Sequence, residues 1–340
     1  MAVPPIVNKA ADGTLHDFVQ TYRHYRSPVA AARPLRLTVG TRTSPTYRLH
    51  GYWSKKPHEI LAACIDTFTR PGDLVLDPFC GSGGTLLMAS AAGRIGIGTD
   101  LSPAAAFIST TSLDLPSGER IKQLYSELLG RTGTQLEALY TTICHRCDGP
   151  ADTRFTVTSD RYRCQACHRS FLAEDAMINR TAKSCPHCLQ RLPRPYTREG
   201  QMPVEISAHC RRKCHTGPLR RRYDDSDPAA RTAFHNFDLP LATNPGRKIP
   251  DCWFPTNPFP SGLKSAELFR RGIFEVHQLF SPRNLHALAR LRTGIEAFGG
   301  NDHAVLLLIF TGALMSLSLK AQHLEKGGGY LPAMYYVPPV

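Results

Sequence analysis

Eight of the eleven cysteines in this chain fall into four close pairs between residues 144 and 214. The pairs are Cys144 with Cys147, Cys164 with Cys167, Cys185 with Cys188, and Cys210 with Cys214. Two such pairs supply four thiolates, which is the ligand set that a structural zinc ion prefers. Taken in chain order, the pairs predict two consecutive zinc ribbons. The histidines beside them are expected outside the ligand sets, because thiolates suffice for two ions.

Disulfide bonds are the alternative for a cysteine-rich chain, and they are typical of small secreted proteins. The sequence does not open with a basic and then apolar signal segment. Its longest apolar run, 304–319, is shorter than the roughly 20 residues that a helix needs to cross a bilayer. We therefore expect a cytoplasmic protein, in a reducing compartment that favours metal binding over cystine.

The chain is basic, with 41 Lys and Arg against 28 Asp and Glu. Within 144–222 there are 16 basic and 7 acidic residues, a surplus of nine that falls to five once eight thiolates bind two dications. This balance favours a polyanionic partner such as DNA. Two basic runs are expected to contact phosphates, Arg211-Arg212-Lys213 and Arg220-Arg221-Arg222. A purely structural insert or a protein-docking surface is the alternative.

A second pattern lies upstream, where a strand, a glycine turn, a helix and another strand follow in order. A side chain at Gly81 or Gly83 would keep a ligand away from the backbone of this turn. Asp100 follows the second strand, where a carboxylate can accept hydrogen bonds from ribose hydroxyls. Apolar spacing predicts helices over 59–68 and 86–92 and strands at 74–76 and 95–98. The pattern predicts one βαβ unit that binds a ribose-containing cofactor.

The loop sequence distinguishes between classes of cofactor. Nicotinamide and flavin domains have Gly-x-Gly-x-x-Gly, whereas here Asp77-Pro78-Phe79-Cys80 precedes the first glycine. The run Asp-Pro-Phe-Cys-Gly-Ser-Gly-Gly resembles the cofactor motif of S-adenosylmethionine-dependent methyltransferases that modify exocyclic amines of DNA bases (adenine-N6 or cytosine-N4). RNA guanine methyltransferases have a similar loop. The upstream run Tyr52-Trp53-Ser54-Lys55-Lys56-Pro57 resembles the family's other cofactor motif and favours DNA.

The resemblance implies a Rossmann-like, doubly wound α/β sheet, complete or incomplete, with an inserted tandem zinc-ribbon module. It also implies that Asp77 lies near the methionine portion of the cofactor and that Asp100 holds the ribose. The residues implied to bind S-adenosylmethionine are Ser54, Lys55, Pro57, Asp77, Pro78, Phe79, Gly81, Gly83, Thr85 and Asp100.

The catalytic motif of that family does not occur in this sequence. In the family, an Asp/Asn/Ser-Pro-Pro-aromatic tetrapeptide holds the flipped base. The nearest segment here, Thr256-Asn257-Pro258-Phe259-Pro260, lacks the second proline. The catalytic residues therefore stay unknown, and we expect a second polypeptide or a missing C-terminal segment to supply the motif. The alternatives are a zinc-ribbon DNA-binding subunit that keeps a relic cofactor fold, and an RNA methyltransferase.

The predicted organisation has five parts. They are an N-terminal arm at 1–49, a cofactor-binding core at 50–143 that ends in a helix over 121–143, the zinc-ribbon insert at 144–222, a Pro-rich linker at 223–283, and a helical return to the core at 284–340. Helical spacing over 284–298 and 303–320 predicts that return.

Overall fold

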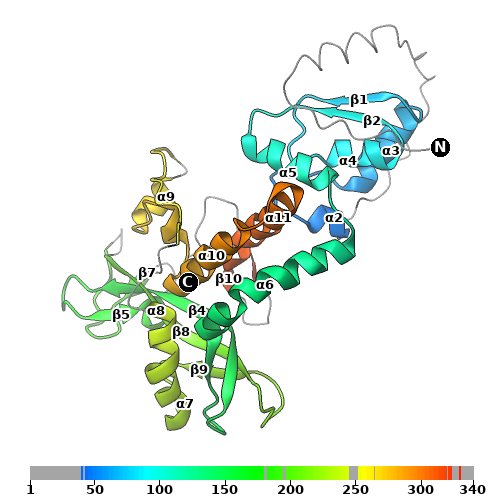
Figure 1. Ribbon diagram of the computed structural model, residues 1–340. Coiled ribbons are helices and arrows are strands. Elements are labelled where there is room, and N and C mark those ends of the chain that lie inside the picture. The colour runs from blue at the N-terminus through cyan, green and yellow to red at the C-terminus, as the bar shows by residue number, and fades with distance from the viewer. Residues whose placement is uncertain are drawn as a thin grey trace. The chain divides into compact units, whose positions relative to one another are not determined.

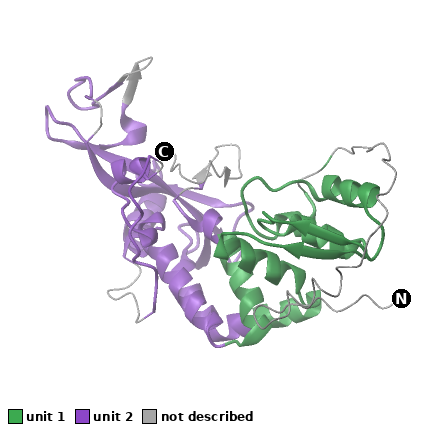
Figure 2. Cartoon of the chain, turned by 90° about the horizontal axis from the view of Figure 1, so that it is seen from above, with its two compact units in different colours: residues 1–125, 298–313 green, residues 126–297, 314–340 purple. Residues whose placement is uncertain are grey.

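The computed structural model (Figure 1) describes most of the chain after residue 42. The described residues are 40, 43–179, 182–193, 197–244, 252–263, 265–319, 321–323 and 329–330. Most of the predicted N-terminal arm lies outside them, as do parts of the predicted linker. The chain divides into two compact units, residues 1–125 with 298–313 and residues 126–297 with 314–340 (Figure 2).

Unit 1 contains a βαβ unit at the place that the sequence predicts. β1 (Leu74–Asp77) and β2 (Ile95–Gly98) are parallel, and α4 (Gly84–Ala91) joins them. The other helices with residues in this unit are α2 (Pro45–Arg48), α3 (His58–Phe68), α5 (Pro103–Leu113), α6 (Gly118–Tyr140) and α11 (Gly300–Leu317). The predicted α/β class is confirmed. Among the described residues this sheet has two strands, so the doubly wound sheet stays a prediction.

α4 packs closely against one face of this sheet. A Cβ at Gly98 would lie 2.5 Å from Leu86 Cδ1, and one at Gly96 would lie 3.1 Å from Leu86 Cα. Leu86 is 6% exposed. The two glycines of β2 therefore let the helix approach the strand.

The opposite face carries four apolar side chains, two from each strand. Residues paired across parallel strands point to the same side, so Leu74, Leu76, Ile95 and Ile97 share this face. None of the four is fully buried, and Leu76 is 66% exposed. Parallel sheets are usually covered on both faces. We call these four residues the open face, since the part of the chain that the structure describes covers it only in part.

The first turns of α11 contact other elements of unit 1. Asn301 Nδ2 donates a hydrogen bond to the carbonyl oxygen of Asp114 at 2.8 Å, and Asp302 pairs with Arg120. Within the described residues, α11 is the one helix whose length and apolar composition would allow it to cross a bilayer, a test that helices of soluble proteins also pass.

Unit 2 is built on a long antiparallel ribbon of two strands. β4 (Pro150–Arg163) and β8 (Arg198–Cys210) pair from Ala151 opposite Cys210 to Tyr162 opposite Arg198, a length of roughly 40 Å at the usual rise per residue. The other strands with residues in this unit are β3 (Thr141–Ile143), β5 (Ser170–Leu172), β6 (Met177–Asn179), β7 (Ala182–Ser184), β9 (Leu219–Arg222), β10 (Gln322–His323) and β11 (Gly329–Tyr330), with the 3-10 turn η1 (Ala173–Asp175). The helix predicted to reach Ile143 ends at Tyr140, because the β-branched run that follows forms β3.

The segment 223–283 differs from the linker predicted for it. It contains α7 (Pro228–Ala233), the π-helical turn η2 (Phe234–Asp238), α8 (Leu239–Thr243), α9 (Ala266–Arg270) and the 3-10 turn η3 (Val276–Leu279), and α10 (Pro282–Ile295) begins at its end. Prolines that suggested a linker lie in first helical turns, where proline is favoured. Pro228, for example, follows Asp227, whose carboxylate caps α7. Phe234 is fully buried, so part of this segment belongs to the core of unit 2.

Candidate cofactor loop and candidate metal centres

The loop between β1 and α4 depends on two glycines with left-handed backbone. Gly81 has φ 52°, and Gly83, which caps α4, has φ 76°, conformations that favour glycine. A Cβ at Gly81 would lie 2.9 Å from the Tyr52 ring, and one at Gly83 would lie 2.7 Å from Ser109 Cβ on α5. The glycines are therefore required for packing within unit 1, a reason that is separate from the ligand approach predicted from the sequence.

Asp100 joins the end of β2 to this glycine loop. Its carboxylate accepts hydrogen bonds from the backbone N–H of Ser102 at 2.9 Å and from that of Gly81 at 2.8 Å. These two amides lower the pKa of Asp100, because they stabilise its charged form. A carboxylate has about four acceptor positions. An ionised acceptor with capacity for ribose hydroxyls therefore lies at the end of β2.

Asp77 lies at the corresponding end of β1. Its Oδ1 accepts from the backbone N–H of Phe79 at 3.1 Å, and the N–H of Cys80 donates to the carbonyl of Thr99 at 3.0 Å. Beside these contacts, Phe79 is 85% exposed and Leu101 is fully exposed. Ligands of α/β sheets bind at the carboxyl ends of the strands. Here that edge brings together two carboxylates, the glycine loop and uncovered apolar side chains.

The upstream motif is folded around Lys55. The ammonium group donates to the carbonyl oxygens of Tyr47 at 2.7 Å and of His50 at 3.2 Å, and it lies 4.9 Å from the centre of the Tyr47 ring. Burial lowers the pKa of Lys55. Lys55 therefore organises its own loop, and its contact with a cofactor stays a prediction. The other predicted contacts are Ser54 and Pro78, both exposed, Pro57 just before α3, and Thr85 in the first turn of α4.

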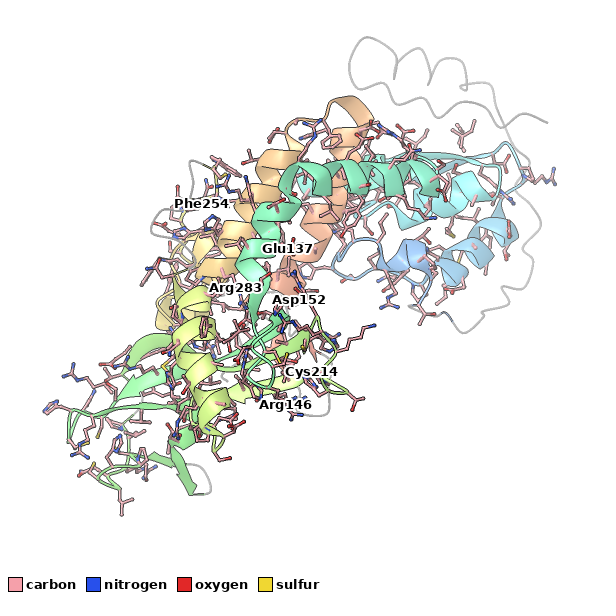
Figure 3. The ribbon with its side chains drawn as sticks, turned by 60° about the horizontal axis from the view of Figure 1, so that its bottom comes forward. Glu137, Arg146, Asp152, Cys214, Phe254 and Arg283 are labelled. Carbon is pink, nitrogen blue, oxygen red and sulfur yellow. The ribbon has the colours of Figure 1, made fainter. Side chains whose placement is uncertain are left out.

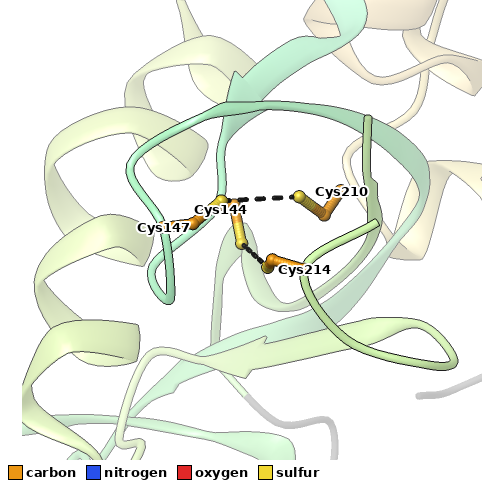
Figure 4. A group of neighbouring side chains, drawn as sticks. All are labelled: Cys144, Cys147, Cys210 and Cys214. Atoms are coloured by element: carbon orange, nitrogen blue, oxygen red, sulfur yellow. Dashed lines mark hydrogen bonds between the residues drawn. The ribbon is translucent and has the colours of Figure 1, made fainter. Parts of the chain in front are cut away.

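Two groups of four cysteines lie at the two ends of the β4–β8 ribbon. Centre 1 comprises Cys144, Cys147, Cys210 and Cys214 (Figure 4), and centre 2 comprises Cys164, Cys167, Cys185 and Cys188. Sulfur atoms are 3.5 and 3.6 Å apart in the paired contacts of centre 1, and 3.7 Å in both contacts of centre 2. Four sulfurs bound tetrahedrally at about 2.3 Å from one zinc ion are about 3.8 Å apart, whereas a disulfide measures about 2 Å. Both groups therefore fit a metal ion.

The three Cys-x2-Cys loops share one backbone turn. The fourth residue after the first cysteine has a left-handed conformation, and its N–H donates to that cysteine's carbonyl at 2.9 Å; these residues are Asp148, His168 and Leu189. Backbone N–H groups also donate to sulfur. Those of Cys167 and Cys214 lower the pKa of Cys164 and Cys210, respectively, to about 6. This favours the metal-binding thiolate form at these two residues, whereas burial and the neighbouring cysteines raise the pKa of Cys188 and Cys214 to about 12.

The grouping of the cysteines corrects the consecutive ribbons predicted from chain order. Centre 1 joins the first pair to the last pair, and centre 2 joins the two middle pairs. The reason is the antiparallel pairing of β4 with β8, which brings the start of β4 beside the end of β8. Centre 2 is thus nested inside centre 1 in the sequence, with the same eight cysteines as candidate ligands.

The structure also corrects the two predicted phosphate-binding runs. Arg221 is fully buried and pairs with Asp238, so a phosphate contact by Arg221 is wrong. Arg211 pairs with Glu137 and Asp152 (Figure 3). Three other basic residues in the loops of centre 1 are exposed and have no acidic partner among the described residues. They are Arg146, Arg212 and Lys213. A basic surface therefore lies at this centre, and it keeps Arg212 and Lys213 from the predicted run while adding Arg146.

The segment Asn257-Pro258-Phe259-Pro260 has no free aromatic ring for a base. It lies in unit 2, where the carbonyl of Asn257 accepts from the N–H of Val276 at 3.0 Å. The Phe259 side chain packs against the buried Leu268 and Ile273. The contacts of this segment are thus those of a small local core.

The comparisons with known proteins concern unit 1. The sequence profile of the DNA methylase family matches residues 36–110, which include the upstream motif, the glycine loop and Asp100. The type II methyltransferase M.MjaII of Methanocaldococcus jannaschii is 29% identical over 96 residues, covering 28% of this chain and 18% of that protein. The type II methyltransferase M.EcaI of Enterobacter cloacae is 46% identical over 56 residues, covering 16% of this chain and 12% of that protein. No solved structure gives a significant match.

These matches define the class of the βαβ unit and its glycine loop. The resemblance to DNA amino-methyltransferases predicted from the sequence is confirmed for the segment 36–110, which matches the DNA methylase family. The chain spans less than a fifth of the length of the two relatives named above.

Proposed function

We propose that this chain is the cofactor-binding part of an S-adenosylmethionine-dependent DNA methyltransferase that acts on an exocyclic amine of adenine or cytosine. One observation carries the proposal: Asp100 is bonded to Gly81 at the carboxyl ends of β1 and β2, inside the segment that matches DNA methylases. This contact inside the matching segment supports a cofactor loop with Asp100 as its ribose acceptor in unit 1.

S-adenosylmethionine suits the residues at this edge, and when bound it supplies a methyl group that is activated for transfer to an amine. Asp100, already ionised, accepts hydrogen bonds from the ribose hydroxyls, each contributing about 1.5–3 kcal/mol because the acceptor is charged. Asp77 lies on the methionine side. The exposed ring of Phe79 is available to exclude water from the bound molecule.

The proposal includes a second segment or polypeptide that supplies the catalytic tetrapeptide. The open face supports this part, because Leu76 is 66% exposed and burying such a side chain contributes about 1.5–3 kcal/mol. Phe79 and Leu101 are two further exposed apolar side chains, at the cofactor edge. Alone, the chain is expected to bind S-adenosylmethionine without transferring its methyl group.

We further propose that each cysteine centre holds one structural zinc ion and that unit 2 contacts DNA. Arg146, Arg212 and Lys213 are the residues that we assign to phosphate contacts, since they are exposed and have no acidic partner among the described residues. Such contacts are independent of base sequence and weaken with salt. A reducing cytoplasm, which keeps thiols available to metal, suits this assignment.

The test is isothermal titration of the purified chain with S-adenosylmethionine, combined with a zinc assay and a methyl-transfer assay on DNA. Binding with two zinc ions per chain and no transfer supports the proposal. Absence of binding would reject it in favour of a zinc-ribbon DNA-binding subunit with a relic cofactor fold. Tighter binding to structured RNA than to DNA at equal salt would instead favour an RNA methyltransferase.

A further inference from the structure

A fully buried ion pair lies beside metal centre 1. Arg221 on β9 and Asp238 at the end of η2 both have 0% exposed side chains. Arg221 Nη2 donates to Asp238 Oδ1 at 2.8 Å, and Arg221 Nε lies 2.8 Å from Asp238 Oδ2. Taking two charges out of water costs several kcal/mol per ion. Stability alone is therefore a weak explanation for this pair.

The same guanidinium group reaches the backbone that positions a cysteine. Arg221 Nη1 donates to the carbonyl oxygen of Ile143, the residue directly before Cys144. Arg221 Nη2 lies 3.2 Å from Thr142 Oγ1, and that hydroxyl donates to Asp238 Oδ1 at 2.6 Å. The end of β3 is therefore fixed to the ion pair by both a carbonyl and a side chain.

The pair and centre 1 share one core. Phe234, at the start of the π-helical turn that ends at Asp238, packs with Cys144 and Cys210. Burial lowers the pKa of Arg221, whereas the charges of Asp238 and Cys144 raise it. The carbonyl that Arg221 holds belongs to the residue directly before Cys144, so the guanidinium lies next to the backbone of this ligand.

The negative charge of a metal centre with four thiolates explains why a buried cation lies beside it. Four thiolates around one dication carry a net charge of −2, and Cys144 is fully buried. A buried cation beside that ligand offsets part of this negative charge, because water does not reach the buried sulfur to do so. We propose that Arg221 is a positioning residue of metal centre 1, which holds the strand end before Cys144 and offsets its thiolate charge, while Asp238 orients Arg221. This inference rests on the proposed zinc ions.

The test measures zinc affinity at centre 1 alone, in the full chain with Cys164→Ser to disable centre 2, by competition with a chromophoric chelator. Arg221→Met is expected to lower the affinity about 10- to 100-fold, the usual effect of losing an outer partner of a metal ligand. Arg220→Met is the matched control, because its side chain is the adjacent one on β9 and is 53% exposed. It is expected to leave the affinity unchanged.

Asp238→Asn separates this role from a purely structural one. It removes the carboxylate charge but leaves the guanidinium beside Cys144, so we expect a lower melting temperature and a zinc affinity within about threefold of the parent. Equal affinity losses for Arg221→Met and Asp238→Asn, or no loss for Arg221→Met, would overturn the inference.

If Arg221→Met does not fold, Arg221→Lys is the deciding variant, since it keeps the charge but loses the forked donors. Reduced zinc affinity of Arg221→Lys supports the inference, and unchanged affinity overturns it. Zinc absent from the unsubstituted chain would instead reject the proposed zinc ions themselves.

Discussion

Gly83 and Gly93 have nearly the same left-handed backbone, with φ 76° and 73°, but only Gly83 is crowded. A Cβ at Gly83 would lie 2.7 Å from Ser109 Cβ, whereas one at Gly93 would have Pro71 Cβ as its nearest neighbour, at 3.9 Å. Alanine at either position is expected to cost about 1–2 kcal/mol for the backbone. Gly83→Ala should cost about 1–3 kcal/mol more, because α5 must shift. Denaturant unfolding of the two variants measures the difference, and equal losses would contradict the close contact.

Asp100 accepts hydrogen bonds from two loop amides and is also the proposed ribose acceptor, so the choice of substitution is important. Asp100→Asn keeps an oxygen that can accept from a loop amide but removes the charge, so we expect S-adenosylmethionine affinity to fall about 10- to 100-fold. Asp100→Ala should remove most of the affinity, and zinc content should stay the same in both. Titration calorimetry measures the affinities, with the exposed Asp114→Asn as the control. Unchanged affinity in both Asp100 variants would exclude the ribose assignment.

At the scale of residues, the sequence predicted which residues form the glycine loop but only part of their contacts. The positions of Gly81, Gly83 and Asp100 follow from a local pattern of strand, turn and helix. Their contacts with Tyr52 and Ser109 come from other elements, so local spacing cannot reveal them. Arg221 shows the same limit, because a run of three arginines predicts exposure until the middle one is placed in the core.

At the scale of elements, the pairing of β4 with β8 decides which cysteines share a metal ion, and double substitutions test this. Cys144→Ser with Cys210→Ser should release about one zinc ion per chain, since both residues belong to centre 1. Cys144→Ser with Cys164→Ser should release about two, one from each centre. Consecutive ribbons would give the opposite result. Elemental analysis of the purified variants counts the zinc.

The helices and strands themselves were largely predictable, and their partners were not. Apolar periodicity located the strands of unit 1 and the helices that flank them. The elements within 223–283 were missed, because prolines in first helical turns were interpreted as breaks. Strand pairing across the whole cysteine insert depends on contacts between distant segments, and a single sequence does not encode these in its spacing.

At the scale of the molecule, the two proposed functions belong to different units. The match to DNA methylases ends at residue 110, inside unit 1. All eight paired cysteines lie in unit 2, which has its own buried core. Cofactor binding and zinc binding should therefore respond independently to substitutions in the two units.

The last prediction concerns the open face of unit 1. It distinguishes a face that a second segment covers from a face that other residues of this chain cover. Leu76→Lys should change the free energy of unfolding by less than about 0.5 kcal/mol, since its side chain is 66% exposed. Leu86→Lys, on the helix α4 that covers the other face of this sheet, should cost more than about 3 kcal/mol by burying an unpaired charge. Denaturant unfolding and S-adenosylmethionine titration of both variants provide the comparison. A large loss of stability for Leu76→Lys would mean that other residues of this chain cover the face, and the case for a second segment would then lose its structural support.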